Sequence, residues 1–202
     1  MTPLQRIAVG LIVVFGSATW PAHPHPAWQT WDLLADPVGW VLVVLGLVPL
    51  RRLHASFRLP LGLALLAGAV SVPLWFPQLR MHLDASGSWV ASLPQLACCL
   101  FLARAIAAVG AAQQPPDRYL VGRFGLLGWA FLVVAVLPPV VLGGHLDSLR
   151  GATLAFSMLV DVALVWFLFL AHRRPVLGGP GTREAGAGRA GPGRLRRGRR
   201  SG

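Results

Sequence analysis

The chain of 202 residues has no lysine, a single glutamate and few charges of either sign, since only 12% of its residues are charged. Hydrophobic residues make up 55%, and the mean hydropathy is +0.62. So little polar surface cannot cover a soluble globule of this length, which argues against a water-soluble fold. The lack of lysine, beside abundant Gly, Pro, Ala and Arg, indicates the base composition of a GC-rich genome and supports no functional argument.

Cysteine is nearly absent as well. Cys98 and Cys99 are the only two, and they are neighbours within an apolar run. A disulfide between adjacent residues needs a strained ring, and the pair lacks the spacing of metal ligands. We expect both to be buried thiols that pack as small apolar side chains.

Enzyme motifs are missing too. The sequence has no HExxH, GxSxG or Walker A motif, and its one glutamate, Glu184, lies near the C-terminus. Haem ligation needs histidines inside membrane helices, whereas His54 and His172 fall at predicted helix ends. We therefore predict no enzymatic activity and no cofactor, and a hydrolase of another geometry is the enzymatic alternative.

Long apolar runs are what the sequence has instead. A helix that crosses a hydrocarbon core of about 30 Å needs about 20 mostly apolar residues. The runs predict an all-α integral membrane protein whose residues 1–174 form a bundle of six transmembrane helices. If Ile7 to Trp20 is the core of a cleaved signal peptide, five helices remain, but no clean cleavage site follows it. The predicted helices are residues 4–20, 33–50, 59–76, 88–112, 124–144 and 151–171.

Arginines fall in every second connection between these helices, and positively charged loops stay on the cytoplasmic side. Both termini are therefore predicted to lie in the cytoplasm, with the protein in the bacterial plasma membrane. An Asp precedes each helix that starts outside, where a carboxylate caps free backbone N–H groups and favours the helix dipole. The inner arginines are Arg6, Arg51, Arg52, Arg58, Arg118, Arg123, Arg173 and Arg174, and the outer aspartates are Asp32, Asp36, Asp84 and Asp147.

The composition changes at Pro175, after which large apolar residues are almost absent. Residues 175–202 are therefore predicted to be a disordered, Gly/Arg-rich cytoplasmic tail. Because each basic residue near anionic lipid gains about 1 kcal/mol, we expect the tail to contact such lipids and not to bind a specific nucleic acid. A solvated tail that only enforces topology is the alternative. The lipid-contacting candidates are Arg194, Arg196, Arg197, Arg199 and Arg200.

The segment WDLLADPVGWVLVVLGLVPLRR, Trp31 to Arg52, resembles one found in small, uncharacterised multi-pass membrane proteins of bacteria. Their pattern is roughly D-L-L-P-D-x-x-G-W/Y, followed by an apolar helix with a basic end. Asp32, Asp36, Gly39 and Trp40 match it, and Ala35 stands at the proline position. The resemblance implies a membrane helix and no activity. In physical terms, Asp36 is predicted to cap a helix that begins at Pro37.

Sliding the sequence by 89 residues lays GWVLVVLGLVP, from Gly39, over GWAFLVVAVLP, from Gly128. The same shift places the first helix on the fourth and the third on the sixth. Two three-helix halves of opposite orientation, as in many carriers, would produce this pattern. Apolar helices also match by chance.

Two charges, Arg104 and Asp161, fall inside apolar helices. Asp161 lies ten residues past Gly151, about 15 Å along the helix and near the midplane. An intramembrane charge costs about 2.5 to 3.5 kcal/mol, so we predict that Asp161 faces the bundle interior. It either pairs with Arg104 or stays protonated, bonded to Ser157.

A duplicated His-Leu-Asp tripeptide lies at two outer helix ends, with His82 and Asp84 in one copy and His145 and Asp147 in the other. Imidazole and carboxylate groups could bind a divalent metal if they converge, whereas helix capping already explains the aspartates.

Two functions from different classes remain. The first is a non-enzymatic membrane component that acts by helix packing with a partner protein or with itself. The second is a small proton-coupled carrier or channel that uses Asp161.

Overall fold

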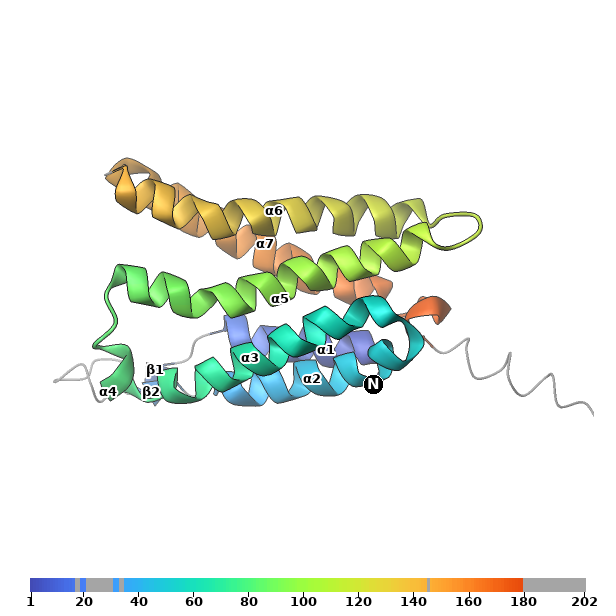
Figure 1. The fold of residues 1–202 in the computed structure, drawn as a ribbon, viewed down its shortest axis with the longest axis horizontal. Helices are drawn as coiled ribbons and strands as arrows, with labels where there is room; N and C mark the ends of the chain where they lie inside the picture. Colours follow the sequence, from blue (N-terminus) through green and yellow to red (C-terminus); the bar gives the residue numbers. More distant parts are fainter. Residues whose placement is uncertain (17–18, 21–30, 33–34, 145, 180–202) are drawn as a thin grey trace, which may run out of the picture.

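The computed structural model describes residues 1–16, 19–20, 31–32, 35–144 and 146–179. It is built almost entirely from helices (Figure 1). A pair of two-residue antiparallel strands, β1 (Thr19–Trp20) and β2 (Trp31–Asp32), lies at one end. The helices are α1 (Pro3–Phe15), α2 (Asp36–Leu53), η2 (Ala55–Phe57), α3 (Arg58–Leu74), α4 (Pro77–Arg80), α5 (Ala85–Ala111), α6 (Arg118–Gly143), η3 (Asp147–Leu149), α7 (Arg150–Ala171) and η4 (Pro175–Leu177), where η marks a 3-10 helix.

Four helices of the described chain are long and apolar enough to cross a membrane: Ala55–Leu74, Ala85–Ala111, Arg118–Gly143 and Arg150–Ala171. The prediction of a helical protein with apolar spans is therefore confirmed. The helix α1 is shorter than the predicted helix of residues 4–20: it has 13 residues and ends at Phe15. It measures about 20 Å at 1.5 Å per residue.

Helix starts differ from the predicted ones for local reasons. The Asp84 carboxylate accepts a hydrogen bond from the backbone N–H of Gly87 at 2.6 Å, so α5 begins at Ala85. Asp117 accepts from the N–H groups of Tyr119 and Leu120, and α6 accordingly begins six residues before the predicted 124. The expectation that Asp36 caps α2 is wrong. Ala35 is the cap, without a side-chain bond, and Asp36 lies in the first turn.

The six long helices, α1, α2, α3, α5, α6 and α7, alternate in direction. The start of α1, the α2–α3 and α5–α6 connections and the end of α7 therefore gather at one end, here called the terminal end (Figure 1). The α3–α5 and α6–α7 connections and the β1–β2 pair lie at the opposite end.

The helices pack as two halves, α1–α3 and α5–α7. In the first half, α2 packs between α1 and α3, and in the second half, α6 packs between α5 and α7. The two halves contact each other through α1 against α7 and α3 against α5. If α1, α2 and α3 are matched with α5, α6 and α7, the corresponding helices have corresponding neighbours. The register agrees as well: Gly39 lies against Gly10 and Val14, and Gly128 lies against Leu100 and Arg104. A shift of Gly10 and Val14 by 89 residues gives positions 99 and 103, and the observed partners, Leu100 and Arg104, each lie one residue further on.

The core is one cluster of buried apolar side chains that includes residues from both halves. Its largest fully buried side chains come from α1, α2, α5, α6 and α7, together with Phe57 of η2. Apolar side chains in such a core pack by shape, so their volumes decide how closely the helices approach. The members with least exposure include Phe57, Phe124, Phe131, Leu4, Ile7, Leu11, Leu47, Ile106 and Leu164.

The segment after α7 differs from the predicted tail, because residues 175–179 are folded against the bundle. Leu177 is fully buried, and the carbonyl oxygen of Val176 lies 2.9 Å from His54 Nε2. Gly178 has a φ of 79° and lies against Pro3. The apolar Val and Leu of this segment explain the docking. We call residues 172–179 the C-terminal clasp. The remaining tail, residues 180–202, lies outside the described residues, as do its five lipid-contacting arginines.

Candidate functional site

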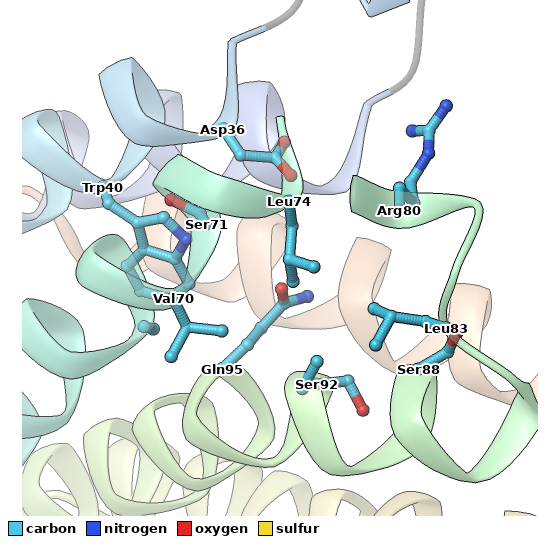
Figure 2. Close-up of a pocket in the computed structure, with 12 residues that line it drawn as sticks. Asp36, Trp40, Val70, Ser71, Leu74, Arg80, Leu83, Ser88, Ser92 and Gln95 are labelled. Carbon is cyan, nitrogen blue, oxygen red and sulfur yellow. The ribbon is translucent and has the colours of Figure 1, made fainter. Parts of the chain in front are cut away.

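A cavity of about 230 Å³ lies at the end of the bundle opposite the terminal end, between α2, α3, α4 and α5 (Figure 2). It joins the two halves, since α2 and α3 belong to the first and α5 to the second. Polar and apolar side chains both reach it. The lining residues are Asp36, Trp40, Ala67, Val70, Ser71, Leu74, Arg80, Leu83, Ser88, Ala91, Ser92 and Gln95.

The side of the cavity made by α2 and α3 is closely packed. Asp36 is the first residue of α2, and Trp40 follows about one turn later on the same face. Trp40 is only 2% exposed and packs over Gly68, where a Cβ atom would lie 3.2 Å from the Trp40 Cβ. The Ser71 hydroxyl donates to the Gly68 carbonyl at 2.8 Å.

The other side of the cavity comes from one face of α5. Ser88, Ser92 and Gln95 follow one another at spacings of four and three, which place them on one stripe of a helix. The Ser92 hydroxyl donates to the Trp89 carbonyl at 2.7 Å. The indole N–H of Trp89 donates to the Ala135 carbonyl of α6 at 3.0 Å, which fixes this part of α5.

The two charged residues of the lining point in different directions. Figure 2 shows the Asp36 carboxylate turned toward Leu74 at the rim, and the Arg80 guanidinium pointing away from the cavity. The Gln95 carboxamide reaches up between the helices toward Leu74. The cavity therefore has a carboxylate at its rim, the Gln95 amide inside it and an apolar wall.

The structure does not bring Arg104 and Asp161 together, although both belong to its described part. The Arg104 guanidinium lies over the Trp129 ring, 5.5 Å from its centroid, on the exposed surface of the bundle. Asp161 is close enough to Cys99 of α5 to interact with it electrostatically. Cys99 and Arg104 are five residues apart, or about 140° around the helix, so they face different ways. The Ser157 hydroxyl donates to the Thr153 carbonyl and not to Asp161.

The predicted metal ligands do not form a site within the described residues, where no group of three or more His, Cys, Asp and Glu side chains could hold an ion. His82 is exposed, its Nδ1 lies 2.6 Å from the Gln78 carbonyl oxygen, and Asp84 caps α5. His145 and the side chain of Asp147 lie outside the described residues. Cys98 and Cys99 are free and buried, as expected.

One polar cluster at the terminal end was not predicted. Arg174 Nη1 lies 2.7 Å from Asp117 Oδ2, and the Arg174 guanidinium stands over the Tyr119 ring at 5.6 Å. The signal for Asp117 was present, because it precedes an apolar helix just as Asp84 does. The polar stripe of α5 was also readable at positions 88, 92 and 95, where polar residues recur at helical spacing.

Comparison of the chain with protein-family models, with curated proteins and with solved structures gives no match. The fold and the cavity define a helical protein with four helices that are able to cross a membrane. Everything beyond that class is argued below from the geometry.

Proposed function

We propose that the chain is an integral protein of the bacterial plasma membrane with six transmembrane helices, α1 and α2 included, and with both termini in the cytoplasm. The alternation of the helices supports this topology, and so does the distribution of arginine. Eight arginines lie at the terminal end, which the tendency of basic loops to stay inside makes cytoplasmic. They are Arg6, Arg51, Arg52, Arg58, Arg118, Arg123, Arg173 and Arg174.

The short α1 is proposed to be retained and not to be cleaved. One of its faces is buried, with Leu4, Ile7 and Leu11 at most 1% exposed, and it contacts both α2 and α7. Removing it would expose that apolar surface of both neighbours. A helix of about 20 Å is shorter than the hydrocarbon core, so the bilayer is expected to thin locally around it.

Cysteine labelling in intact cells tests the orientation. A Ser56→Cys variant is expected to react only after the membrane has been opened, whereas Ala85→Cys and Ser148→Cys react from outside. Cys98 and Cys99 are buried and give little background. Reaction of the cysteine at position 56 in unopened cells would reverse the orientation.

We propose that the protein acts as a non-enzymatic membrane component, by packing against a partner protein or against itself. The observation that supports this is the exposed pair of Arg104 and Trp129 on the outer surface of α5 and α6. A charge within a span costs about 2.5 to 3.5 kcal/mol unless it meets a partner group or water. Trp129 is 61% exposed beside it, and aromatic residues and arginine are the side chains enriched at protein interfaces.

Disulfide crosslinking in native membranes tests this function. A cysteine at Leu126, which is 67% exposed on α6, is expected to give a specific dimer or a product with one other protein. The matched control is a cysteine at Leu65, which is 57% exposed on α3. Monomer alone at position 126 would show that this face of α6 meets only lipid. The same products at both positions would show that the crosslinking is not specific to this face, which also contradicts the proposal.

A small proton-coupled carrier is the second candidate, and the position of Asp161 favours it. Asp161 is partly buried and lies within electrostatic range of Cys99 of α5, and no ion pair or hydrogen bond to its carboxyl group occurs among the described residues. Acidic groups within spans often serve proton relays. An Asp161→Asn variant that folds normally and loses pH-driven flux in liposomes would support the carrier. Equal flux in both proteins would exclude it.

The basic tail is proposed to contact anionic lipid on the cytoplasmic side, since each arginine near such a surface gains about 1 kcal/mol. Removal of residues 181–202 is expected to weaken salt-sensitive binding to anionic vesicles. The thermal stability in neutral detergent should remain, because the clasp ends at residue 179. Unchanged vesicle binding would exclude a lipid role for the tail.

A further inference from the structure

A second cavity, of about 640 Å³, lies at the terminal end of the bundle, between the start of α1, the end of α2 and the clasp. Its volume falls within the range of about 300–1,000 Å³ that is usual for ligand sites. The clasp lines one side, where a Cβ on Gly178 would lie 3.1 Å from Pro3 of α1 and 3.9 Å from Leu53 of α2. The clasp therefore contacts both helix ends beside the cavity.

The charged side chains of this cavity are of one sign. Arg6 of α1 and Arg52 of α2 line it, and none of the described residues around it is acidic. Neither guanidinium takes part in an ion pair, a hydrogen bond or a ring contact within the described chain, whereas Arg174 of the clasp is paired with Asp117. Two like charges in one cavity repel each other, and an anion between them removes that repulsion.

The two arginines approach each other along the bundle. Helices α1 and α2 are antiparallel, and Gly46 lies against Ile7. Arg52 follows Gly46 by six residues, and Arg6 directly precedes Ile7. Their Cα atoms are therefore roughly 8 Å apart along the axis. Since a Cα–Cβ bond tilts toward the N-terminus of its own helix, the Arg6 stem leans toward the terminal end and the Arg52 stem leans away from it, so the two converge on the cavity.

The kind of anion follows from the guanidinium group and from the rest of the lining. Guanidinium presents a planar fork of N–H donors that bonds two oxygens of one phosphate group. Pro3, Pro49 and Leu53 add apolar surface beside the arginines. This combination suits a phosphate that carries a carbon skeleton better than it suits a bare inorganic ion.

We propose that this cavity binds an organic phosphate. The phosphate group lies between Arg6 and Arg52, and its carbon part packs against Pro49 and Leu53. Two sources share this chemistry: the headgroup of an anionic phospholipid, and a free organic phosphate. Only the first source rests on the proposed membrane location, and neither needs the arginines of residues 180–202.

Lipid titration of the full chain in dodecyl maltoside, followed by native mass spectrometry, tests the proposal. Phosphatidylglycerol carries a net negative charge, and phosphatidylcholine with the same acyl chains carries none. We expect phosphatidylglycerol to bind at least fivefold more tightly. Equal binding of the two lipids would overturn the preference for an anion.

Variants locate the binding. Arg6→Gln and Arg52→Gln should each weaken phosphatidylglycerol binding by about tenfold, since each removes one charged fork from the phosphate. Arg51→Gln is the matched control, because this neighbouring arginine of α2 is also exposed and does not line the cavity. Its effect should stay below about twofold, as expected of a screened surface charge. Equal losses in all three variants would indicate a general attraction to basic surface, and this result, or unchanged binding in both cavity variants, contradicts the site.

Calorimetry with glycerol 3-phosphate separates the two sources. Binding of this soluble probe that is lost in Arg6→Gln identifies a free organic phosphate as a ligand, and binding of phosphatidylglycerol alone identifies the lipid headgroup. Both results keep the phosphate site, whereas failure of both probes to bind overturns it. Because the measurements are made in detergent, they do not depend on the orientation or on the packing partner. Failure here is therefore distinguishable from failure of the proposed topology or function.

Discussion

The two three-helix halves share an order of packing but reach it by different means. In α1–α3, backbones touch: a Cβ on Gly39 would lie 2.7 Å from the Gly10 carbonyl oxygen, and one on Gly46 would lie 2.7 Å from the Pro3 carbonyl oxygen. In α5–α7, the space beside Gly128 is filled by the stem of Arg104. At this pair of matched positions, an added methyl group is therefore expected to be tolerated at Gly128 in the second half and not at Gly39 in the first.

The largest expected effect is that of Gly39→Ala. The new methyl group would lie 2.7 Å from both the Gly10 carbonyl oxygen and Val14 Cγ2, so α1 and α2 must separate. We expect a loss of about 1–3 kcal/mol in the free energy of unfolding, the usual range for overpacking. Chemical unfolding in detergent measures it.

Gly62→Ala is the matched control in the same half, because nothing lies within 4 Å of its new Cβ. There the better helix propensity of alanine should leave stability unchanged or raise it by up to about 1 kcal/mol. Equal stability of the Gly39→Ala and Gly62→Ala proteins would show that the backbones of α1 and α2 are not in contact.

The next effect concerns the clasp, which joins the end of the second half to the first. A double-mutant cycle of Asp117→Asn and Arg174→Gln should give a coupling of about 1 kcal/mol, at the upper end for ion pairs because the Asp117 side chain is only 11% exposed. Asparagine preserves the cap of α6, so the cycle isolates the ion pair. A coupling near zero would mean that the clasp is held by Leu177 and by the contact of His54 with Val176, without a contribution from the ion pair.

A smaller effect is expected for Gly128→Ala, the counterpart of Gly39→Ala in the second half. The closest atom to the new Cβ is Arg104 Cγ at 3.2 Å, which belongs to a flexible chain and can move. The change in unfolding free energy should stay below about 0.5 kcal/mol, as at sites without special contacts. If Gly128→Ala is as harmful as Gly39→Ala, the contrast between the halves is wrong.

The smallest expected effect is the coupling between Arg104 and Asp161. The two lie on different faces of the bundle and share no contact, so Arg104→Gln and Asp161→Asn should be additive within about 0.5 kcal/mol. Thermal or chemical unfolding of the two single variants and the double variant measures this. A coupling above 1 kcal/mol would restore the ion pair that the sequence suggested.

These contrasts show which features could be predicted from the sequence. Apolar run length predicted the helices, and the Asp84 cap followed from a local pattern. The depths of Arg104 and Asp161 could be estimated from the rise per residue, but the faces they occupy depend on which helices become neighbours. The cavity could not be predicted, because Trp40 of α2 and Gln95 of α5 line it together only after both helices have packed on α3. The folding of the clasp against the bundle was not predicted, because this segment has few large apolar residues. The burial of Leu177 nevertheless docks it.

The position of α1 between α2 and α7 has a consequence for biosynthesis. Among the described helices, α1 is synthesised before the others and is in contact with α7, Arg150–Ala171, which is synthesised after them. At 5–20 residues per second, a delay on the order of ten seconds separates the synthesis of the two helices. During that interval the face of α1 that α7 will cover has no partner from its own chain. A nascent chain halted before α7 therefore leaves this apolar face of α1 uncovered.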